Sequence, residues 1–141
     1  MKSDSFYDNI IPYIKMILIK TKLDKSKTHG LGLFADQFIP KGTTTWVYSN
    51  KYDQAFTKKD IEKMDEITKK QFFKYAYWDK TINKYVLCFD DQRFINHSSR
   101  PNILSTQKED IAARDIKKGE ELLCDYTKFD ENYFDNIGFE H

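Results

Sequence analysis

Two short polar segments, each beside apolar residues, constrain this chain more than any other feature. Residues 93–102 read Arg-Phe-Ile-Asn-His-Ser-Ser-Arg-Pro-Asn and place amide, imidazole and hydroxyl groups in a turn. Residues 119–126 read Gly-Glu-Glu-Leu-Leu-Cys-Asp-Tyr, which is a glycine turn and an apolar strand followed by a carboxylate and a phenol. Polar side chains on turns next to hydrophobic strands are typical of a site rather than of a core. The two segments are therefore the first candidates for a functional site.

The hydrophobic pattern of the rest of the chain predicts an α+β protein that is mostly β. Short runs rich in β-branched and aromatic residues, bounded by turn residues, predict strands. These runs cover residues 16–19, 33–39, 43–48, 84–89, 111–116 and 121–126. Apolar residues at helical spacing after the capping sequence Thr-Lys-Lys-Asp predict one main helix over 58–75. Residues 25–32 are expected to form a polar loop, and residues 1–14 an irregular lead-in.

Composition and charge exclude several classes. A chain of 141 residues with 40 % hydrophobic and 16 % aromatic residues predicts one ordered domain. No apolar run approaches the ~20 residues of a membrane helix, and we expect no membrane partner and an intracellular protein, cytoplasmic or nuclear. A net charge of +1 argues against direct nucleic-acid binding. The acidic tail after Lys128 is either a solvated surface or a rim that attracts a basic peptide.

The cysteines and histidines predict neither a disulfide nor a metal site. Cys88 and Cys124 lie in predicted apolar strands, where a thiol stays protonated, and their spacing is not that of a metal-binding pair. The three histidines have no paired spacing, so no zinc site is expected. Ser98 lacks the glycine elbow of a hydrolase nucleophile, and its neighbour His97 should point away from it.

Three other features have a structural as well as a functional explanation. Gly30-Leu31-Gly32 lacks the third glycine and the following helix of a dinucleotide site, so it is either a hairpin turn or backbone that approaches a ligand. Asn96 and His97, each taken alone, can be satisfied polar residues of a core. The aromatic cluster at 75–78 can pack a core or line a site. The combination of Asn-His with Pro-Asn and a later Asp-Tyr favours a functional site.

At these residues the chain resembles the SET-domain protein lysine methyltransferases, in a small form without the C-terminal zinc motif. The resemblance is carried by Gly30-Leu31-Gly32-Leu33-Phe34-Ala35, Tyr75-Ala76-Tyr77, Arg93-Phe94-Ile95-Asn96-His97-Ser98 with Pro101-Asn102, and Gly119-Glu120-Glu121-Leu122 with Asp125-Tyr126. It covers residues 15–134, which leaves 135–141 as a tail. It implies several small curved sheets with a C-terminal strand threaded beside the Asn96–His97 segment as a pseudoknot.

The resemblance also implies a cofactor, a substrate and a role for each matched residue. The cofactor is S-adenosylmethionine, and the substrate is a lysine of a protein or peptide, a histone tail being one candidate. Cofactor-binding residues are expected at His29, Gly30, Leu31, Gly32, Arg93, Phe94, Asn96, His97, Tyr126, Phe129 and Tyr133. Tyr126 is expected to be the catalytic tyrosine, and Tyr75, Tyr77 and Cys124 to line the substrate channel. No metal is expected, and a homodimer is possible through an exposed strand or the N-terminal segment.

The resemblance has consequences for the product and leaves rival interpretations open. Cys124 stands where many family members carry Phe or Tyr, and the smaller side chain predicts that dimethylation or trimethylation is allowed. The polar segment between Asn102 and Ile111 is short, so one hairpin is expected to be trimmed. The alternatives are a catalytically inactive SET-like module that binds a peptide or partner, and a structural domain without a cofactor.

Overall fold

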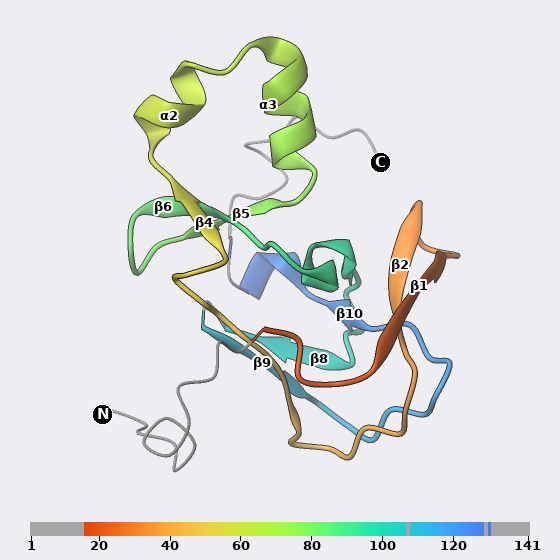
Figure 1. Ribbon diagram of the computed structural model, residues 1–141. Coiled ribbons are helices and arrows are strands. Elements are labelled where there is room, and N and C mark those ends of the chain that lie inside the picture. Colours follow the sequence, from red (N-terminus) through yellow and green to blue (C-terminus); the bar gives the residue numbers. More distant parts are fainter. Residues whose placement is uncertain (1–15, 107, 129, 131–141) are drawn as a thin grey trace.

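The computed structural model describes residues 16–106, 108–128 and 130, and its strands form three small sheets (Figure 1). β1 (Thr21–Lys25) and β2 (Leu31–Ala35) form an antiparallel pair. A three-stranded sheet has the order β4 (Gln54–Phe56), β6 (Lys84–Leu87), β5 (Ala76–Asp79). A five-stranded sheet has the order β3 (Thr44–Val47), β9 (Glu109–Ala112), β8 (Ile103–Ser105), β10 (Leu123–Cys124), β7 (Asn96–His97). The predicted mostly β, α+β architecture is confirmed.

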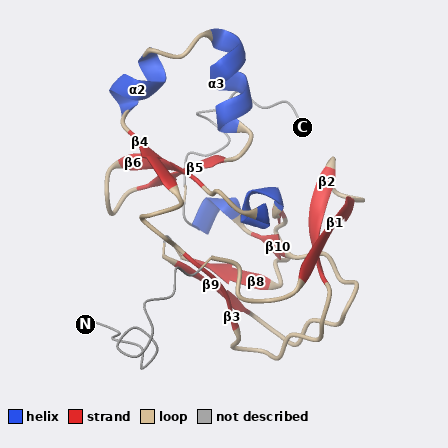
Figure 2. Cartoon of the chain, viewed as in Figure 1, coloured by secondary structure: helices blue, strands red, loops and turns tan. Residues whose placement is uncertain are grey.

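The predicted single helix over 58–75 is wrong, because the structure has two helices there (Figure 2). α2 (Lys58–Glu62) begins with the predicted capping box at Thr57. α3 (Glu66–Phe73) begins at a second cap, where Asp65 is extended and its side chain accepts a hydrogen bond from the backbone N–H of Thr68 at 2.7 Å. An N-cap residue has non-helical backbone angles, so Asp65 ends one helix and starts the next.

The strand predictions hold in part. Residues 16–19 contribute only one isolated bridge, between Ile17 and Trp46, whereas β1 begins at Thr21 and ends at Lys25, where the expected polar loop starts. The last strand is shorter than predicted, because β10 is followed by the 3₁₀ helix η2 (Tyr126–Lys128). Strands β4, β5 and β8 were not predicted. β4 pairs with the sequence-distant β6, whereas β5 and β8 each form a short hairpin with the strand that follows, and cross-strand pairing overrides local preference.

The last strand is threaded between two strands that follow one another in sequence. β10 pairs in parallel with β7 on one side and with β8 on the other. The Asn102 side chain fixes this arrangement, since its amide donates to the Glu121 carbonyl at 2.8 Å and its oxygen accepts from the Leu123 N–H at 2.8 Å. The expected insertion of the C-terminal strand beside Asn96 and His97 is therefore present.

Two groups of buried apolar side chains form the core. The larger joins β2 to the five-stranded sheet and consists of Leu33, Ala35, Ile39, Ile95, Ile103, Ala112, Ile116, Leu122 and Cys124. The smaller packs α2 and α3 against the three-stranded sheet through Ile61, Phe72 and Ala76. In Figure 1 the two helices lie beyond this sheet, on the side away from the five-stranded one. The candidate site lies between these two core groups.

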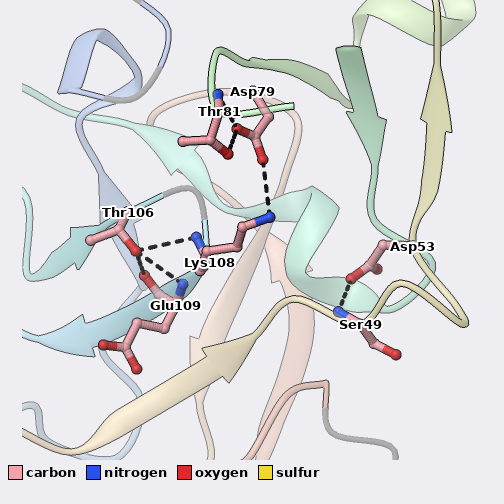
Figure 3. A network of polar contacts seen from close by, with 7 residues as sticks. All are labelled: Ser49, Asp53, Asp79, Thr81, Thr106, Lys108 and Glu109. Carbon is pink, nitrogen blue, oxygen red and sulfur yellow. Dashed lines mark hydrogen bonds and ion pairs between the residues drawn. The ribbon is translucent and has the colours of Figure 1, made fainter. Parts of the chain in front are cut away.

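A polar contact links the two larger sheets (Figure 3). The β8–β9 turn is held by the Thr106 hydroxyl, which accepts from the backbone N–H groups of Lys108 and Glu109 at 3.2 and 3.0 Å. The turn presents Lys108, whose Nζ lies 3.7 Å from the fully buried carboxylate of Asp79 at the end of β5. A buried carboxylate needs such a partner, so this pair helps to fix the sheets relative to each other.

Candidate active site

A cavity of about 60 Å³ lies where the two sheets approach each other. It is lined by residues from β3, β8, β9 and β10, from the 3₁₀ helix η1 (Asp91–Phe94), from one end of the three-stranded sheet and from η2. These residues are Trp46, Lys74, Tyr75, Ala76, Tyr77, Cys88, Gln92, Arg93, Ile95, Ser105, Thr106, Asp110, Cys124 and Tyr126. The three predicted channel residues and the predicted catalytic tyrosine therefore surround one space.

Tyr126 is held at this cavity by the segment that precedes β7 and by β7 itself. Its hydroxyl donates a hydrogen bond to the carbonyl of Ile95, and its backbone N–H donates to Nδ1 of His97 at 3.1 Å. The rings of Tyr126 and His97 are 5.3 Å apart. The hydroxyl proton is committed to Ile95, so the phenol oxygen presents its lone pairs to anything else that enters. The threading of β10 thus determines where this oxygen lies.

Asn96, the residue after Ile95, connects three parts of the chain. Its side-chain nitrogen donates to the carbonyls of His29 and Leu31 and to the carboxylate of Glu121, each at 3.0 Å. The loop before β2 is thereby fixed to β7 and to the segment before β10. The amide hydrogens of Asn96 serve these protein acceptors, so in this arrangement Asn96 positions the 29–31 backbone.

The loop itself requires glycine for two different reasons. Gly30 has φ of +50°, a left-handed conformation that side chains disfavour, and no atom lies within 4 Å of where its Cβ would be. At Gly32 a Cβ would lie 2.2 Å from the Glu121 carboxylate, so a side chain here would displace that carboxylate. The result is bare backbone at His29, Gly30 and Leu31, close to Asn96.

Aromatic side chains form part of the cavity lining. The rings of Tyr75 and Phe94 meet edge to face at 5.6 Å, and the Arg93 guanidinium lies 5.4 Å from the Tyr75 ring and 5.1 Å from the Phe94 ring. Tyr77, from β5, lines the same space. Cation–π contacts of this kind order a ring without a hydrogen bond. Arg93 and Phe94 therefore support Tyr75.

The cavity disfavours negative charge on its two thiols and on the phenol of Tyr77. Burial raises the pKa of the Cys88 and Cys124 thiols well above their usual value, and burial also raises the pKa of Tyr77. Neither cysteine is a nucleophile in such surroundings. Burial raises the pKa of Asp110 to about 7, against the nearby Ser105 hydroxyl and the hydrogen bond from Gln92, which lower it. An apolar aromatic wall and one buried carboxyl thus share the same space.

The structure brings most of the predicted site residues together in two adjoining groups. Tyr75, Tyr77, Arg93, Cys124 and Tyr126 line the cavity, and Phe94 packs on Tyr75. His29, Leu31, Asn96 and His97 lie in the adjoining group, with the two glycines between them. Phe129 and Tyr133 lie outside the described residues, so their expected contact with a cofactor stays a prediction.

The sequence did not identify the other side of the cavity, which consists of Trp46, Gln92, Ser105 and Asp110. These residues come from β3, η1, β8 and β9, and they meet through the pairing of β9 with β3 and β8 and the hydrogen bond from Gln92 to Asp110. Asp110 was read as part of a trimmed polar connection, although it is buried. Within the described part of the chain, no group of three or more His, Cys, Asp or Glu could hold a metal ion. The helices described there are too short or too polar to cross a membrane.

Comparison with known proteins identifies a family and a fold. The family model described as the SET domain matches residues 30–127. No curated protein sequence matches the chain significantly. Among solved structures, apo Polycomb Repressive Complex 2 of Chaetomium thermophilum, with two substitutions in Ezh2, superimposes with a TM-score of 0.66 at 21 % identity. That match covers 84 % of this chain and 16 % of the other.

Two further structures have the same fold. The autoinhibited Chaetomium complex bound to S-adenosylmethionine gives a TM-score of 0.63 at 22 % identity, over 85 % of this chain and 16 % of that one. A proposed histone methyltransferase of Plasmodium falciparum gives 0.56 at 23 % identity, over 78 % of this chain and 95 % of that one. This chain thus spans about 16 % of the length of the Polycomb chains. At these identities the likeness establishes the fold.

Proposed function

The chain belongs to the SET domain family, and on this premise we propose that it is a protein-lysine N-methyltransferase that uses S-adenosylmethionine. The observation that carries the proposal is the position of Tyr126. Its phenol lines a cavity with Tyr75, Tyr77 and Cys124, and its hydroxyl is anchored to Ile95, directly before Asn96. A phenol at the base of an aromatic channel suits the transfer of a methyl group to an amine, because it can help to orient the methyl group in line with the amine.

The residues present fit the cofactor. Bare backbone at 29–31 with open space over Gly30 suits close approach by the methionine part, and the exposed backbone edge around His97 lies next to it. Arg93 adds a cation for a carboxylate. When bound, S-adenosylmethionine supplies a methyl group on a positively charged sulfur. Asn96 acts on this site by holding the 29–31 backbone in place.

The protein contributes position and electrostatics to the reaction. The aromatic walls formed by Tyr75 and Tyr77 exclude water and disfavour the ammonium form of a lysine, whose free pKa is ~10.4. The Tyr126 oxygen offers lone pairs that hold a polarised methyl group by weak C–H···O contacts. Alignment of amine, methyl carbon and sulfur on one line then supplies much of the acceleration.

The substrate is proposed to be an extended basic segment of a protein, such as a histone tail, or a segment of a ribosomal or other protein in the cytoplasm or nucleus. Within the described sheet, β5 is an edge strand and carries Tyr77, and its Trp78 N–H donates to Asp130 at 3.1 Å, so a peptide is proposed to pair beside Tyr77 while its lysine enters the cavity. A small Cys124 thiol leaves room beside the amine. We therefore expect dimethyl or trimethyl products.

The first test is methyl transfer from radiolabelled S-adenosylmethionine onto histones and onto cell extract, with calorimetry of cofactor binding. We expect labelled lysine and heat of binding for the wild type. Binding without transfer to any protein would instead favour an inactive SET-like module that only binds a partner.

Tyr126→Phe makes the test specific. Loss of the hydroxyl removes the bond to Ile95 and the lone pairs offered to the methyl group, so kcat should fall about 10²–10³-fold, as when one stabilising group is removed. Cofactor affinity, measured by calorimetry, should stay within a few-fold of the wild type. A parallel loss of affinity and kcat would assign Tyr126 a structural role.

A second prediction concerns the degree of methylation. Mass spectrometry of a lysine peptide driven to full conversion should reveal dimethyl or trimethyl product, because Cys124 neither fills the cavity nor adds a phenol. A product that stops at monomethyl-lysine with excess cofactor would contradict the role given to Cys124.

A further inference from the structure

A row of polar side chains crosses one wall of the cavity. In the five-stranded sheet, Trp46 of β3 and Ser105 of β8 lie directly opposite Asp110 of β9, one on each side. Directly opposite residues project from the same face of a sheet. All three line the cavity that also contains Tyr126 and Cys124. The row therefore faces the space in which the substrate amine is proposed to react.

Asp110 in the middle of the row is a buried carboxyl group, and burial makes its ionised form unfavourable. It is 3 % exposed, and Gln92 donates a hydrogen bond from Nε2 to its Oδ2. Burial is the main influence on its ionisation, and the three residues that also affect it, Ser105, Gln92 and Glu109, are not cations. Buried carboxylates are normally paired with a cation or left protonated.

The two side chains beside Asp110 are incompletely bonded. The indole nitrogen of Trp46 is buried without a hydrogen-bond partner. The Ser105 hydroxyl lies close enough to affect Asp110 and Cys124, yet it makes no hydrogen bond of regular geometry. Buried polar groups of a folded protein are almost always satisfied. Unsatisfied groups around a cavity indicate that a polar occupant belongs there.

We propose that Asp110 accepts the proton of the substrate ammonium, and that Gln92 holds the carboxylate in position to do so. The proposal rests on the proposed function, since the cation in question is the target lysine. Ser105 and Trp46 complete the polar wall against which the amine, or a water molecule that relays its proton, is bound. Asp110 would be a catalytic residue additional to Tyr126, in the lining of the same cavity.

The step balances without any further reactant. An N–H bond of the ammonium breaks and an O–H bond forms on Asp110, while the electron pair stays on nitrogen. The carboxylate becomes a neutral acid and the ammonium a neutral amine, so two buried charges disappear together. The amine then takes the methyl group and becomes cationic again. Asp110 returns its proton to water when the product leaves.

The surroundings of Asp110 suit a group that ionises near neutral pH. The titratable or charged groups that face it or share the cavity are Glu109 on β9, Arg93 on η1, Lys74 and Tyr75 before β5, Tyr77 on β5, Cys88 after β6, Cys124 on β10 and Tyr126 on η2. The thiols and Tyr77 are neutral at pH 7 because burial raises their pKa. A proton acceptor works best when its pKa is close to the operating pH, and the pKa of Asp110 is about 7.

Asp110→Asn tests the role by its effect on the pH profile. The amide keeps the shape and can still accept from Gln92, but it takes no proton. At pH 7 we expect kcat to fall about 10²-fold, the usual contribution of a positioned base. As the pH approaches 10, solvent deprotonates the free amine and the deficit should shrink below tenfold. Asp53→Asn is the matched control, because Asp53 is a buried carboxyl outside the cavity lining, and its pH profile should match the wild type.

A binding measurement makes the test independent of turnover. The probe is butylammonium, which mimics the lysine side chain, and the readout is the carboxyl carbon-13 shift of Asp110 during a pH titration. A cation held at the carboxylate should lower the midpoint of that titration by at least one pH unit. An unchanged midpoint, or equal kcat and pH profile in wild type and Asp110→Asn, would overturn the role of Asp110. A wild type that labels no lysine would overturn the proposed function itself.

Discussion

At the scale of single residues, the site is held by a few side chains that each serve several backbone segments. Asn96 holds the 29–31 loop and Glu121 with one amide nitrogen. Glu121 in turn limits the space at Gly32. Such shared contacts make the local geometry cooperative, because a change at one member displaces the others.

Gly32→Ala should disturb this cluster through a steric clash. The new Cβ would lie 2.2 Å from the Glu121 carboxylate, which must move and release Asn96. We expect a loss of about 1–3 kcal/mol in the free energy of unfolding, measured in urea. The double-mutant cycle with Glu121→Ala identifies the cause, since removal of the carboxylate should recover much of the loss. Strictly additive effects would show that the clash is not with Glu121.

Asp110 gives a prediction on stability as well as on turnover. Its pKa is about 7 in the folded protein against an ordinary value of 3.8, so the folded state binds more protons than the unfolded state between these values. Wild-type stability should therefore fall as the pH rises from about 4 to about 7, by roughly 4 kcal/mol at most. Asp110→Asn lacks this loss.

The comparison to make is urea unfolding of wild type and Asp110→Asn at pH 5 and pH 8. We expect the variant to gain stability relative to the wild type on going to pH 8, with Asp91→Asn, an exposed carboxylate on η1, as the control. A difference that does not change with pH would mean that Asp110 is not a protonated buried acid near neutrality. A variant that is more stable and less active would identify Asp110 as a residue kept for function.

Some residues of the site could be predicted from the sequence, and others could not. Tyr126, Asn96 and the loop glycines lie in contiguous motifs, and the resemblance of these motifs to the SET-domain family predicted that they belong to one site. Trp46, Ser105 and Asp110 are joined only by the register of β3, β9 and β8. A register is set by the whole sheet and is not written in any one segment. For the same reason a buried Asp110 was read as part of a polar connection.

At the scale of elements, the threaded strand β10 determines the position of Tyr126. It has only two residues, Leu123 and Cys124, and most of its anchoring comes from neighbours. Ser98 donates its backbone N–H to the Cys124 carbonyl at 2.9 Å, and Asn102 donates its own to the Leu123 carbonyl at 3.1 Å. The Asn102 side chain adds two further bonds. Local preference predicted a longer strand, because it does not anticipate that η2 starts at Tyr126.

Asn102→Ala should loosen β10 more than any exposed substitution. Asn102 is buried, and its loss leaves the Glu121 carbonyl and the Leu123 N–H without partners. An unsatisfied buried polar group costs about 1–3 kcal/mol, so the variant should lose about 2–5 kcal/mol of unfolding free energy. Faster amide hydrogen exchange should appear first at Leu123 and Cys124. Asn50→Ala, at an exposed turn position, is the control and should change neither quantity.

In the helical region, too, local apolar spacing did not predict where the elements begin and end. Apolar spacing predicted α2 and α3 as one helix, because Ile61, Met64 and Ile67 continue the helical period across the break. The Asp65 cap interrupts it, and Ile67 is exposed rather than buried. Capping chemistry at Asp65 was therefore a stronger signal than periodicity.

At the scale of the whole molecule, the cavity is a consequence of how two cores are joined. One core lies in the five-stranded sheet and the other beneath the helices, and the cavity has walls from both. The contact between Lys108 and Asp79 connects the sheets at one end. Both walls are needed for a narrow site, because aromatic residues come from one sheet and the threaded strand from the other.

The most direct measurement is a crystal structure of the protein with S-adenosylhomocysteine and a peptide that contains monomethyl-lysine. The account predicts that the amine enters the cavity between Tyr126 and Asp110, and that its methyl carbon lies on the line to the sulfur, ~3–3.5 Å from it. The nucleoside should lie against the 29–32 backbone and the segment at His97. A lysine bound outside this cavity, or a sulfur that cannot reach the Tyr126 hydroxyl, would contradict the account.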